Sequence, residues 1–300
     1  MRENIRGSEL SHKKHQQHIE NLTEDEVFFQ YLSKNSLRYK LNIRTLDILC
    51  PLFNDRNSWL TVGDLAGMEA NYLIDKNQVV TASDISDILL KKAHEMGIIK
   101  SYSRQNVENI TYDNAAFDYV ICRESFHHFP RAYLGLYEMI RVARKAAIII
   151  EPVDILSRMP WILLIKNFCD RINPYLINKI WKNRFSFETV GNYVFKLSAR
   201  EVEKMAMGIG LPCLAIKEMN ILLLNKEQKE LDKTPIDPGT KRKFLRKIRF
   251  LDIISWTGLI PRNTLCCIIF NQMPSQDLKS SLKSKGFVII DLPLNPYLSD

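Results

Sequence analysis

The sequence predicts an α/β protein in which a mostly parallel sheet carries helices on both faces. Between residues 57 and 152, short apolar runs alternate with segments of helical periodicity, and this order is typical of parallel strands joined by helices. The chain has 300 residues, of which 46% are hydrophobic and 25% charged. That composition suffices for a complete core and excludes a largely disordered chain.

Four strands are expected in the first half of the sheet, and helices separate them. Asp84 and Glu151 come at or directly after the ends of two of these strands. The carboxyl ends of parallel strands meet at one edge of a sheet, where such proteins bind ligands. The expected strands are 60–62, 78–82, 117–122 and 146–150, and the expected helices are 70–74, 86–96 and 133–142.

Helical segments are expected on either side of this alternation. Residues 1–56 are interpreted as an N-terminal helical cap, with a capping box at 23–26. Residues 57–300 form the main domain, and the aromatic and basic stretch at about 153–197 is interpreted as a helical lid inserted into it. The later elements expected are a helix from 198 to about 208, strands at 214–216 and 265–270, and a charged surface segment at 225–249.

Charge and cysteine usage limit the partners and the compartment. The net charge of +8 suits an anionic partner, but the basic residues are scattered and no nucleic-acid-binding signature accompanies them, so we expect no nucleic acid partner. The six cysteines form no Cys-x-x-Cys pair, which favours reduced, buried thiols. The polar N-terminus and the short apolar runs predict a cytoplasmic protein without integral membrane contact. The oligomeric state is not indicated.

A glycine turn and an acidic residue predict a nucleoside cofactor. Gly63 and Gly67 bound a turn after the first strand, and Asp84 follows about 20 residues after Gly63, which is the ribose-binding arrangement of Rossmann-like sites. A dinucleotide site requires Gly-x-Gly-x-x-Gly around a pyrophosphate. The turn here carries Asp64, which repels a pyrophosphate but suits the ammonium group of a methionine moiety. The charge therefore favours S-adenosylmethionine over NAD.

Residues 59–152 resemble the core of class I, Rossmann-like S-adenosylmethionine-dependent methyltransferases, in particular a bacterial methyltransferase-domain group with a Gly-Asp turn. The resemblance covers about a third of the chain, and the ordered set of motifs is more specific than any single motif. The matching segments are Leu60-Thr-Val-Gly-Asp64, Val80-Thr-Ala-Ser-Asp-Ile-Ser86, Phe117 to Pro130, Leu136 to Val142 and Ala146 to Pro152.

The resemblance implies positions for the cofactor, S-adenosylmethionine. Asp84 would bind the ribose hydroxyls, and Ile85 would pack on the adenine. The other implied contacts are Gly63, Asp64 and Gly67 on the methionine and ribose side, Asn106 and Val107 at the adenine edge, and Arg123 and Glu124 facing the sulfonium. The sequence departs from the family pattern at one position of the turn, because Leu65 stands where the family usually has a second glycine.

His127 and His128 are the candidate catalytic residues. A histidine near neutral pH removes the proton from an attacking hydroxyl. In an extended chain only one of two adjacent side chains would face the pocket. A structural role for one of them is the alternative. A second group of histidines, at residues 12, 15 and 18, has no accompanying cluster of carboxylates or thiols, so we expect no metal site there.

These observations predict an enzyme that transfers a methyl group from S-adenosylmethionine to oxygen or nitrogen of a small-molecule acceptor, with a sugar or glycan precursor preferred. Leu65 leaves open a non-catalytic methyltransferase-like partner or regulatory protein. An NAD-dependent oxidoreductase is the third hypothesis, and Asp64 and the missing middle glycine count against it.

Overall fold

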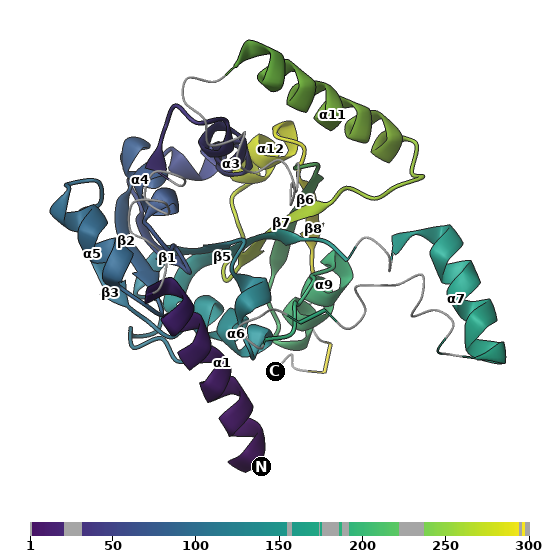
Figure 1. The fold of residues 1–300 in the computed structure, drawn as a ribbon, viewed down its shortest axis with the longest axis horizontal. Coiled ribbons are helices and arrows are strands. Elements are labelled where there is room, and N and C mark those ends of the chain that lie inside the picture. Colours follow the sequence, from purple (N-terminus) through teal and green to yellow (C-terminus); the bar gives the residue numbers. More distant parts are fainter. Residues whose placement is uncertain are drawn as a thin grey trace.

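The computed structural model contains one eight-stranded sheet, with strand order β3-β2-β1-β4-β5-β7-β6-β8 (Figure 1). It describes residues 2–20, 32–154, 158–173, 175, 186–187, 192–221, 237–293 and 296–297. The β3, β2, β1, β4 and β5 strands pair in parallel, whereas β7 pairs antiparallel with both β5 and β6, and β8 pairs antiparallel with β6. The expected mostly parallel α/β sheet is therefore confirmed.

All the strands expected from the sequence are present, and two more complete the edges of the sheet. The expected strands are β1 (Ser58–Val62), β2 (Val79–Asp84), β4 (Phe117–Arg123), β5 (Ala143–Pro152), β6 (Cys213–Met219) and β7 (Thr264–Phe270). The additional edge strands are β3 (Tyr102–Arg104) and β8 (Val288–Asp291).

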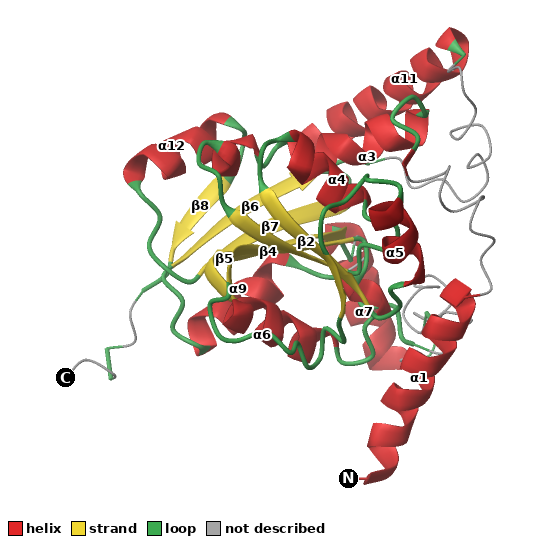
Figure 2. Ribbon diagram, turned by 90° about the vertical axis from the view of Figure 1, so that its left-hand side faces the viewer, coloured by secondary structure: helices red, strands yellow, loops and turns green. Residues whose placement is uncertain are grey.

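Helices cover both faces of the sheet (Figure 2). The first face is covered by α3 (Leu37–Asp47), α4 (Met68–Asp75), α5 (Ile88–Glu95), α12 (Gln276–Ser284) and the short 3-10 helix η1 (Cys50–Phe53). The second face is covered by α6 (Ala132–Val142) and α9 (Ala199–Gly208). The remaining helices are α1 (Arg2–Glu20), α7 (Pro160–Ile172), α11 (Pro238–Trp256) and the 3-10 helix η2 (Phe126–His128).

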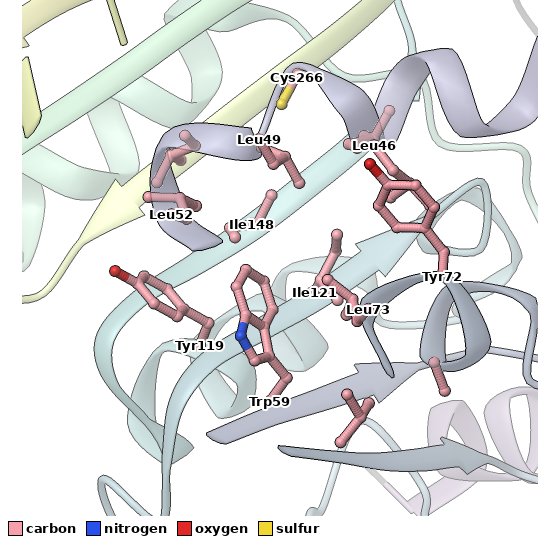
Figure 3. Close-up of a cluster of buried hydrophobic side chains, with 14 of the residues drawn as sticks. Leu46, Leu49, Leu52, Trp59, Tyr72, Leu73, Tyr119, Ile121, Ile148 and Cys266 are labelled. Carbon is pink, nitrogen blue, oxygen red and sulfur yellow. The ribbon is translucent and has the colours of Figure 1, made fainter. Parts of the chain in front are cut away.

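Trp59 anchors the core on the first face (Figure 3). Its side chain is completely buried and packs against the ring of Tyr119, with 4.6 Å between ring centroids. A buried indole N–H needs a partner, and Trp59 Nε1 donates to Gln78 Oε1 at 3.0 Å. Gln78 also accepts from the backbone N–H of Asn57. This network fixes the amino end of β1, and thereby the register that delivers its carboxyl end to the site.

The expected helix at 198 begins with a complete capping box. The Ser198 side chain accepts from the backbone of Glu201, and the Glu201 carboxylate accepts from the backbone N–H of Ser198. The capping box expected at 23–26 lies outside the described residues, as does the first part of the segment 225–249. Within the described part of the chain, no helix is long and apolar enough to cross a membrane.

Candidate active site

The turn after β1 requires both of its glycines. Gly63 has φ +68°, and a Cβ atom there would lie 2.5 Å from Ser125 Cβ. Gly67 has φ +79°, and a Cβ atom there would lie 2.9 Å from Ile99 Cγ2. Both positions therefore accept only glycine without a shift of neighbouring side chains. This requirement arises within the protein itself, whether or not a ligand also approaches the turn.

The Asp64 carboxylate is turned into the protein. It is 2% exposed and accepts from Thr61 Oγ1 at 2.8 Å and from the backbone N–H of Ala70 at 2.9 Å. Burial and the neighbouring Glu69 raise the pKa of Asp64 well above its usual value. The carboxylate thus holds the first turn of α4, and the charge argument that paired it with a ligand ammonium loses its support.

Leu65 adopts an ordinary backbone conformation. Gly63 and Gly67 of this turn have positive φ angles, whereas the φ angle of Leu65 is not positive. Its partly buried side chain packs against a small cluster formed by Ile19 of α1, Ala66 and Leu89. The missing middle glycine therefore introduces no backbone strain, and it adds an apolar contact with the N-terminal helix.

Asp84 lies at the carboxyl end of β2 with a buried carboxylate. It is 6% exposed, and its Oδ1 accepts from the backbone N–H of Ser86 at 3.1 Å. Burial raises its pKa to about 6 despite this bond. Ile85 packs at the margin of the cluster that contains Ile19. Asp84 and Ile85 are thus adjacent to the inner surface of α1.

The loop after β3 contains the two residues expected at an adenine edge. The Asn106 side chain accepts from the backbone N–H of Glu108 at 3.0 Å, which forms a local turn. Val107 is 6% exposed, and its methyl groups fill the space that a side chain at Gly135 would need. The α1 helix reaches this loop, because His12 Nε2 lies 3.4 Å from Glu108 Oε1.

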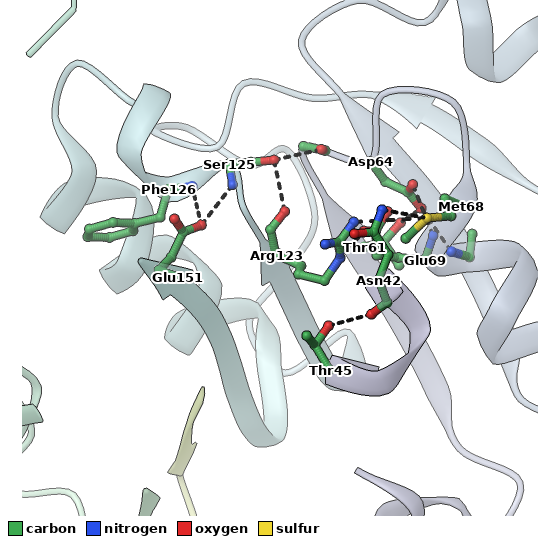
Figure 4. Close-up of polar contacts among 12 residues, drawn as sticks. Asn42, Thr45, Thr61, Asp64, Met68, Glu69, Arg123, Ser125, Phe126 and Glu151 are labelled. Atoms are coloured by element: carbon green, nitrogen blue, oxygen red, sulfur yellow. Dashed lines mark hydrogen bonds and ion pairs between the residues drawn. The ribbon is translucent and has the colours of Figure 1, made fainter. Parts of the chain in front are cut away.

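Arg123 and Glu124 at the end of β4 have different surroundings, and Figure 4 shows the Arg123 side chain turned toward Glu69. Arg123 is buried and its Nε donates to Glu69 Oε1 at 2.5 Å. Burial raises the pKa of Glu69, but the Arg123 guanidinium and the hydrogen bonds to Glu69, including that from Asp64, together leave its pKa lowered. Glu124 has φ +53°, a conformation that costs of order 1–3 kcal/mol for a non-glycine residue. Burial and nearby carboxylates raise the pKa of Glu124.

His127 is paired with a buried carboxylate from the next strand. Its Nδ1 lies 2.7 Å from Glu151 Oε2, and the Glu151 side chain is 0% exposed. The other oxygen of Glu151 accepts from the backbone N–H groups of Ser125 and Phe126 at 2.7 and 2.8 Å. A carboxylate accepts only, so Nδ1 carries the hydrogen and the neutral ring has its lone pair on Nε2. This arrangement suits a general base.

His128 lies beside His127 and faces the N-terminal helix. The two rings are 4.1 Å apart, and the ring of His15 in α1 lies 5.4 Å from that of His128. The chain is not extended here, because Phe126–His128 forms a 3-10 turn. Both rings therefore lie on one side of the turn, rather than on opposite sides as an extended chain would place them.

Two residues of this site were not singled out from the sequence. Glu151 was recognised only as a strand end, and Asn192 was not recognised. Asn192 is 2% exposed, and its Nδ2 donates to the backbone carbonyl of His127 at 3.1 Å. It therefore ties the inserted segment to the histidine turn. Among the described residues, no group of three or more His, Cys, Asp or Glu side chains is placed to hold a metal ion.

Comparison with known families identifies the class of this site. Residues 60–150, from the middle of β1 to the end of β5, match the family described as the methyltransferase domain. This segment, about a third of the chain, is therefore similar to a methyltransferase domain. The predicted class of enzyme, a methyltransferase, is confirmed. None of the curated proteins compared with the chain matches it.

Several solved structures are similar to this chain at low sequence identity. The YcgJ protein from Bacillus subtilis is 15% identical with a TM-score of 0.50, and the match covers 77% of this chain and 98% of that one. Magnesium protoporphyrin IX methyltransferase from Synechocystis is 12% identical with a TM-score of 0.44, covering 78% and 83%. Phosphoethanolamine N-methyltransferase 2 from Haemonchus contortus is 14% identical with a TM-score of 0.47, covering 77% and 52%. The likeness to the YcgJ protein shows the fold alone.

Proposed function

We propose that the chain binds S-adenosylmethionine at the carboxyl ends of β1, β2 and β4 and transfers its methyl group to a small-molecule acceptor. The observation that carries the catalytic part is the pair of His127 and Glu151, which presents an oriented base beside the β4 end. Oxygen is the favoured acceptor atom, because a hydroxyl must lose its proton during attack, whereas a neutral amine attacks without a base.

The residues present fit such a cofactor. Asp84 provides a buried carboxylate for the two ribose hydroxyls, and one of its oxygens accepts from Ser86. Ile85 provides the apolar surface for the adenine, and Asn106 and Val107 border it. Glu124 brings a carboxylate to the end of β4, where it favours the positive sulfonium electrostatically. In our proposal Gly63, Asp64 and Gly67 contribute backbone groups, since the Asp64 side chain is engaged within the protein.

His127 acts on the acceptor in the proposed reaction. When bound, S-adenosylmethionine would supply the methyl group on its sulfonium, and the sulfur would keep the electron pair of the broken C–S bond as the acceptor oxygen bonds to the methyl carbon. The acceptor proton passes to Nε2 of His127, and Glu151 stabilises the resulting imidazolium through its bond to Nδ1.

A sugar or glycan precursor is the preferred acceptor class. Aromatic side chains of the inserted segment gather near the histidine turn, and Tyr193 contacts Phe187 and Phe195 edge to face at 5.7 and 5.2 Å. Phe195 in turn meets Tyr133 of α6. Aromatic faces of this kind pack against the apolar face of a sugar ring. They support the preference without distinguishing one sugar from another.

A non-catalytic methyltransferase-like protein is the second candidate. The observation that favours it is Ile19, which is 4% exposed and packs in the cluster beside Leu65 and Ile85. The Ile19 side chain thereby lies next to the surface that we assign to the adenine. A chain in which α1 keeps the surface around Ile85 covered would retain the fold without turnover.

Calorimetric titration with S-adenosylmethionine, and with NAD in parallel, tests the proposal. We expect binding of S-adenosylmethionine alone, followed by transfer of radiolabelled methyl to an acceptor from a panel of sugars and sugar nucleotides. Binding without transfer to any acceptor favours the non-catalytic candidate. Binding of NAD alone would contradict the cofactor assignment.

A further inference from the structure

The α7 helix presents an apolar stripe to solvent. Trp161, Leu164, Phe168 and Ile172 follow the spacing i, i+3, i+7 and i+11, so they share one face, and each is 64–67% exposed. No residue of this helix is buried. Lys166 and Asp170 form an ion pair at 2.6 Å elsewhere on the helix surface. A soluble helix normally turns such a stripe toward the core, so this stripe indicates an interaction surface.

The α11 helix presents a second exposed surface, and this one is strongly basic. The helix contains six basic residues and one acidic residue. Phe244 and Ile248 are buried against Leu37 and Leu41 of α3. The outer face of the helix carries Arg242, Arg246, Arg249 and Ile253, which follow the spacing i, i+4, i+7 and i+11, and all four are exposed.

Large apolar side chains accompany these arginines. Phe250, Ile253 and Trp256 are 63%, 64% and 83% exposed. Figure 1 shows α11 along the top of the molecule and α7 projecting from its right-hand edge. Exposed aromatic and aliphatic residues next to clustered basic residues are the composition of helices that lie in the interface of a bilayer.

We propose that the apolar stripe of α7 and the arginine face of α11 together form a docking surface for an anionic lipid bilayer. The arginines attract the lipid phosphates, and the apolar side chains enter the boundary between headgroups and acyl chains. A second copy of the chain fits less well, because a two-fold contact through α11 brings like charges together. Nucleic acid also fits less well, since the stripe of α7 includes aliphatic side chains that do not stack on bases.

Sedimentation with lipid vesicles tests this docking. The full chain is mixed with vesicles of phosphatidylcholine alone, or with about one third phosphatidylglycerol added. We expect it to sediment with the anionic vesicles, less with the neutral ones, and less at high salt. The emission of the exposed tryptophans should shift to the blue on binding, because Trp161 and Trp256 leave water.

Two variants address the two helices separately. The triple variant Arg242→Gln, Arg246→Gln and Arg249→Gln should lower the partition coefficient on anionic vesicles about tenfold or more. The double variant Trp161→Ser and Phe168→Ser should lower binding by a similar factor. Since these side chains are exposed, the circular dichroism spectrum should not change. Matched controls are Lys204→Gln, Lys283→Gln and Lys285→Gln for charge, and Met96→Ser with Met273→Ser for exposed apolar side chains.

The outcome is decisive in either direction. Loss of vesicle binding in both helix variants and in neither control supports the proposal. Failure of the unaltered chain to sediment with anionic vesicles overturns it, and so does equal loss in the controls. Light scattering adds one further outcome: if the α7 variant converts a dimer to a monomer and leaves vesicle binding unchanged, a second copy occupies the stripe. None of these measurements depends on methyl transfer.

Discussion

Nδ1 of His127 lies 2.7 Å from Oε2 of Glu151, and that carboxylate has no contact with solvent. Two backbone N–H groups fix its other oxygen, so Glu151 cannot rotate away from the ring. A buried, immobile acceptor sets both the orientation and the tautomer of the imidazole. Glu151 is therefore a positioning residue in the proposed reaction, whereas His127 is the group that meets the acceptor.

Replacing His127 should abolish most of the turnover. His127→Ala removes the base, and general base catalysis contributes about 10²–10⁴-fold, so kcat should fall by that factor while the affinity for S-adenosylmethionine stays unchanged. Glu151→Gln should also lower kcat and shift its pH profile, because the imidazolium loses its anionic partner. The measurement is methyl transfer with the best acceptor found. His128→Ala is the comparison variant, and a larger loss there would reverse the assignment of the two histidines.

Asp84→Asn should weaken cofactor binding. Hydrogen bonds from ribose hydroxyls to a charged acceptor are worth roughly 1.5–3 kcal/mol, which corresponds to about a tenfold to hundredfold increase in Kd. Calorimetric titration measures the change directly. Asp87→Asn, three residues along the same loop, removes the same charge from a partly exposed position and serves as the control. An unchanged Kd for Asp84→Asn would show that the end of β2 does not hold the ribose.

Cofactor affinity should depend on pH through Asp84. Burial raises its pKa to about 6 in the free protein, and only the ionised carboxylate accepts from both ribose hydroxyls. The affinity should therefore be fully present above pH 7 and should be lost as the pH falls through 6, with Kd about tenfold higher at pH 5. Asp84→Asn should remove this component, which separates it from titration of the cofactor itself. A parallel profile in both proteins would contradict the assignment.

The N-terminal helix should compete with the adenine. Ile19 packs beside Ile85, the residue that we expect to contact the base, so Ile19→Ser should lower the Kd for S-adenosylmethionine about three- to tenfold, as the loss of about 1 kcal/mol of apolar contact implies. Bound cofactor should also speed up tryptic cleavage after Lys13 and Lys14 of α1. Leu10→Ser changes an exposed residue of the same helix and is the control. If Ile19→Ser instead binds S-adenosylmethionine more weakly, α1 contacts the bound cofactor and does not compete with it.

The succession of strands and helices and the mostly parallel sheet could be predicted from the sequence, because short apolar runs alternate with segments of helical periodicity. The strands at the two edges could not. Tyr102–Arg104 is three residues long and contains no apolar run. Val288–Asp291 has three apolar residues, but none of its residues is fully buried, and so short an apolar run does not by itself indicate a strand.

The positions of the site residues could be predicted more readily than the directions of their side chains. The Gly-Asp turn placed Asp64 at the end of β1, but the amide groups of α4 decide where its carboxylate points. The pairing of His127 with Glu151 joins residues that are distant in the sequence and adjacent only because β4 and β5 are neighbours. Contacts across strands of this kind leave no local signal.

The sheet can be completed only late in synthesis, because a central strand pairs with a strand from near the end of the sequence. Strand β5 lies between β4 and β7, and β7 (Thr264–Phe270) is synthesised more than a hundred residues later. A chain emerging from the ribosome thus carries β5 with one row of backbone groups unpaired until its last segment appears. Such long-range pairing is slow and exposes an aggregation-prone edge. A fragment ending at residue 152 should therefore aggregate, although it contains the complete segment that matches the family.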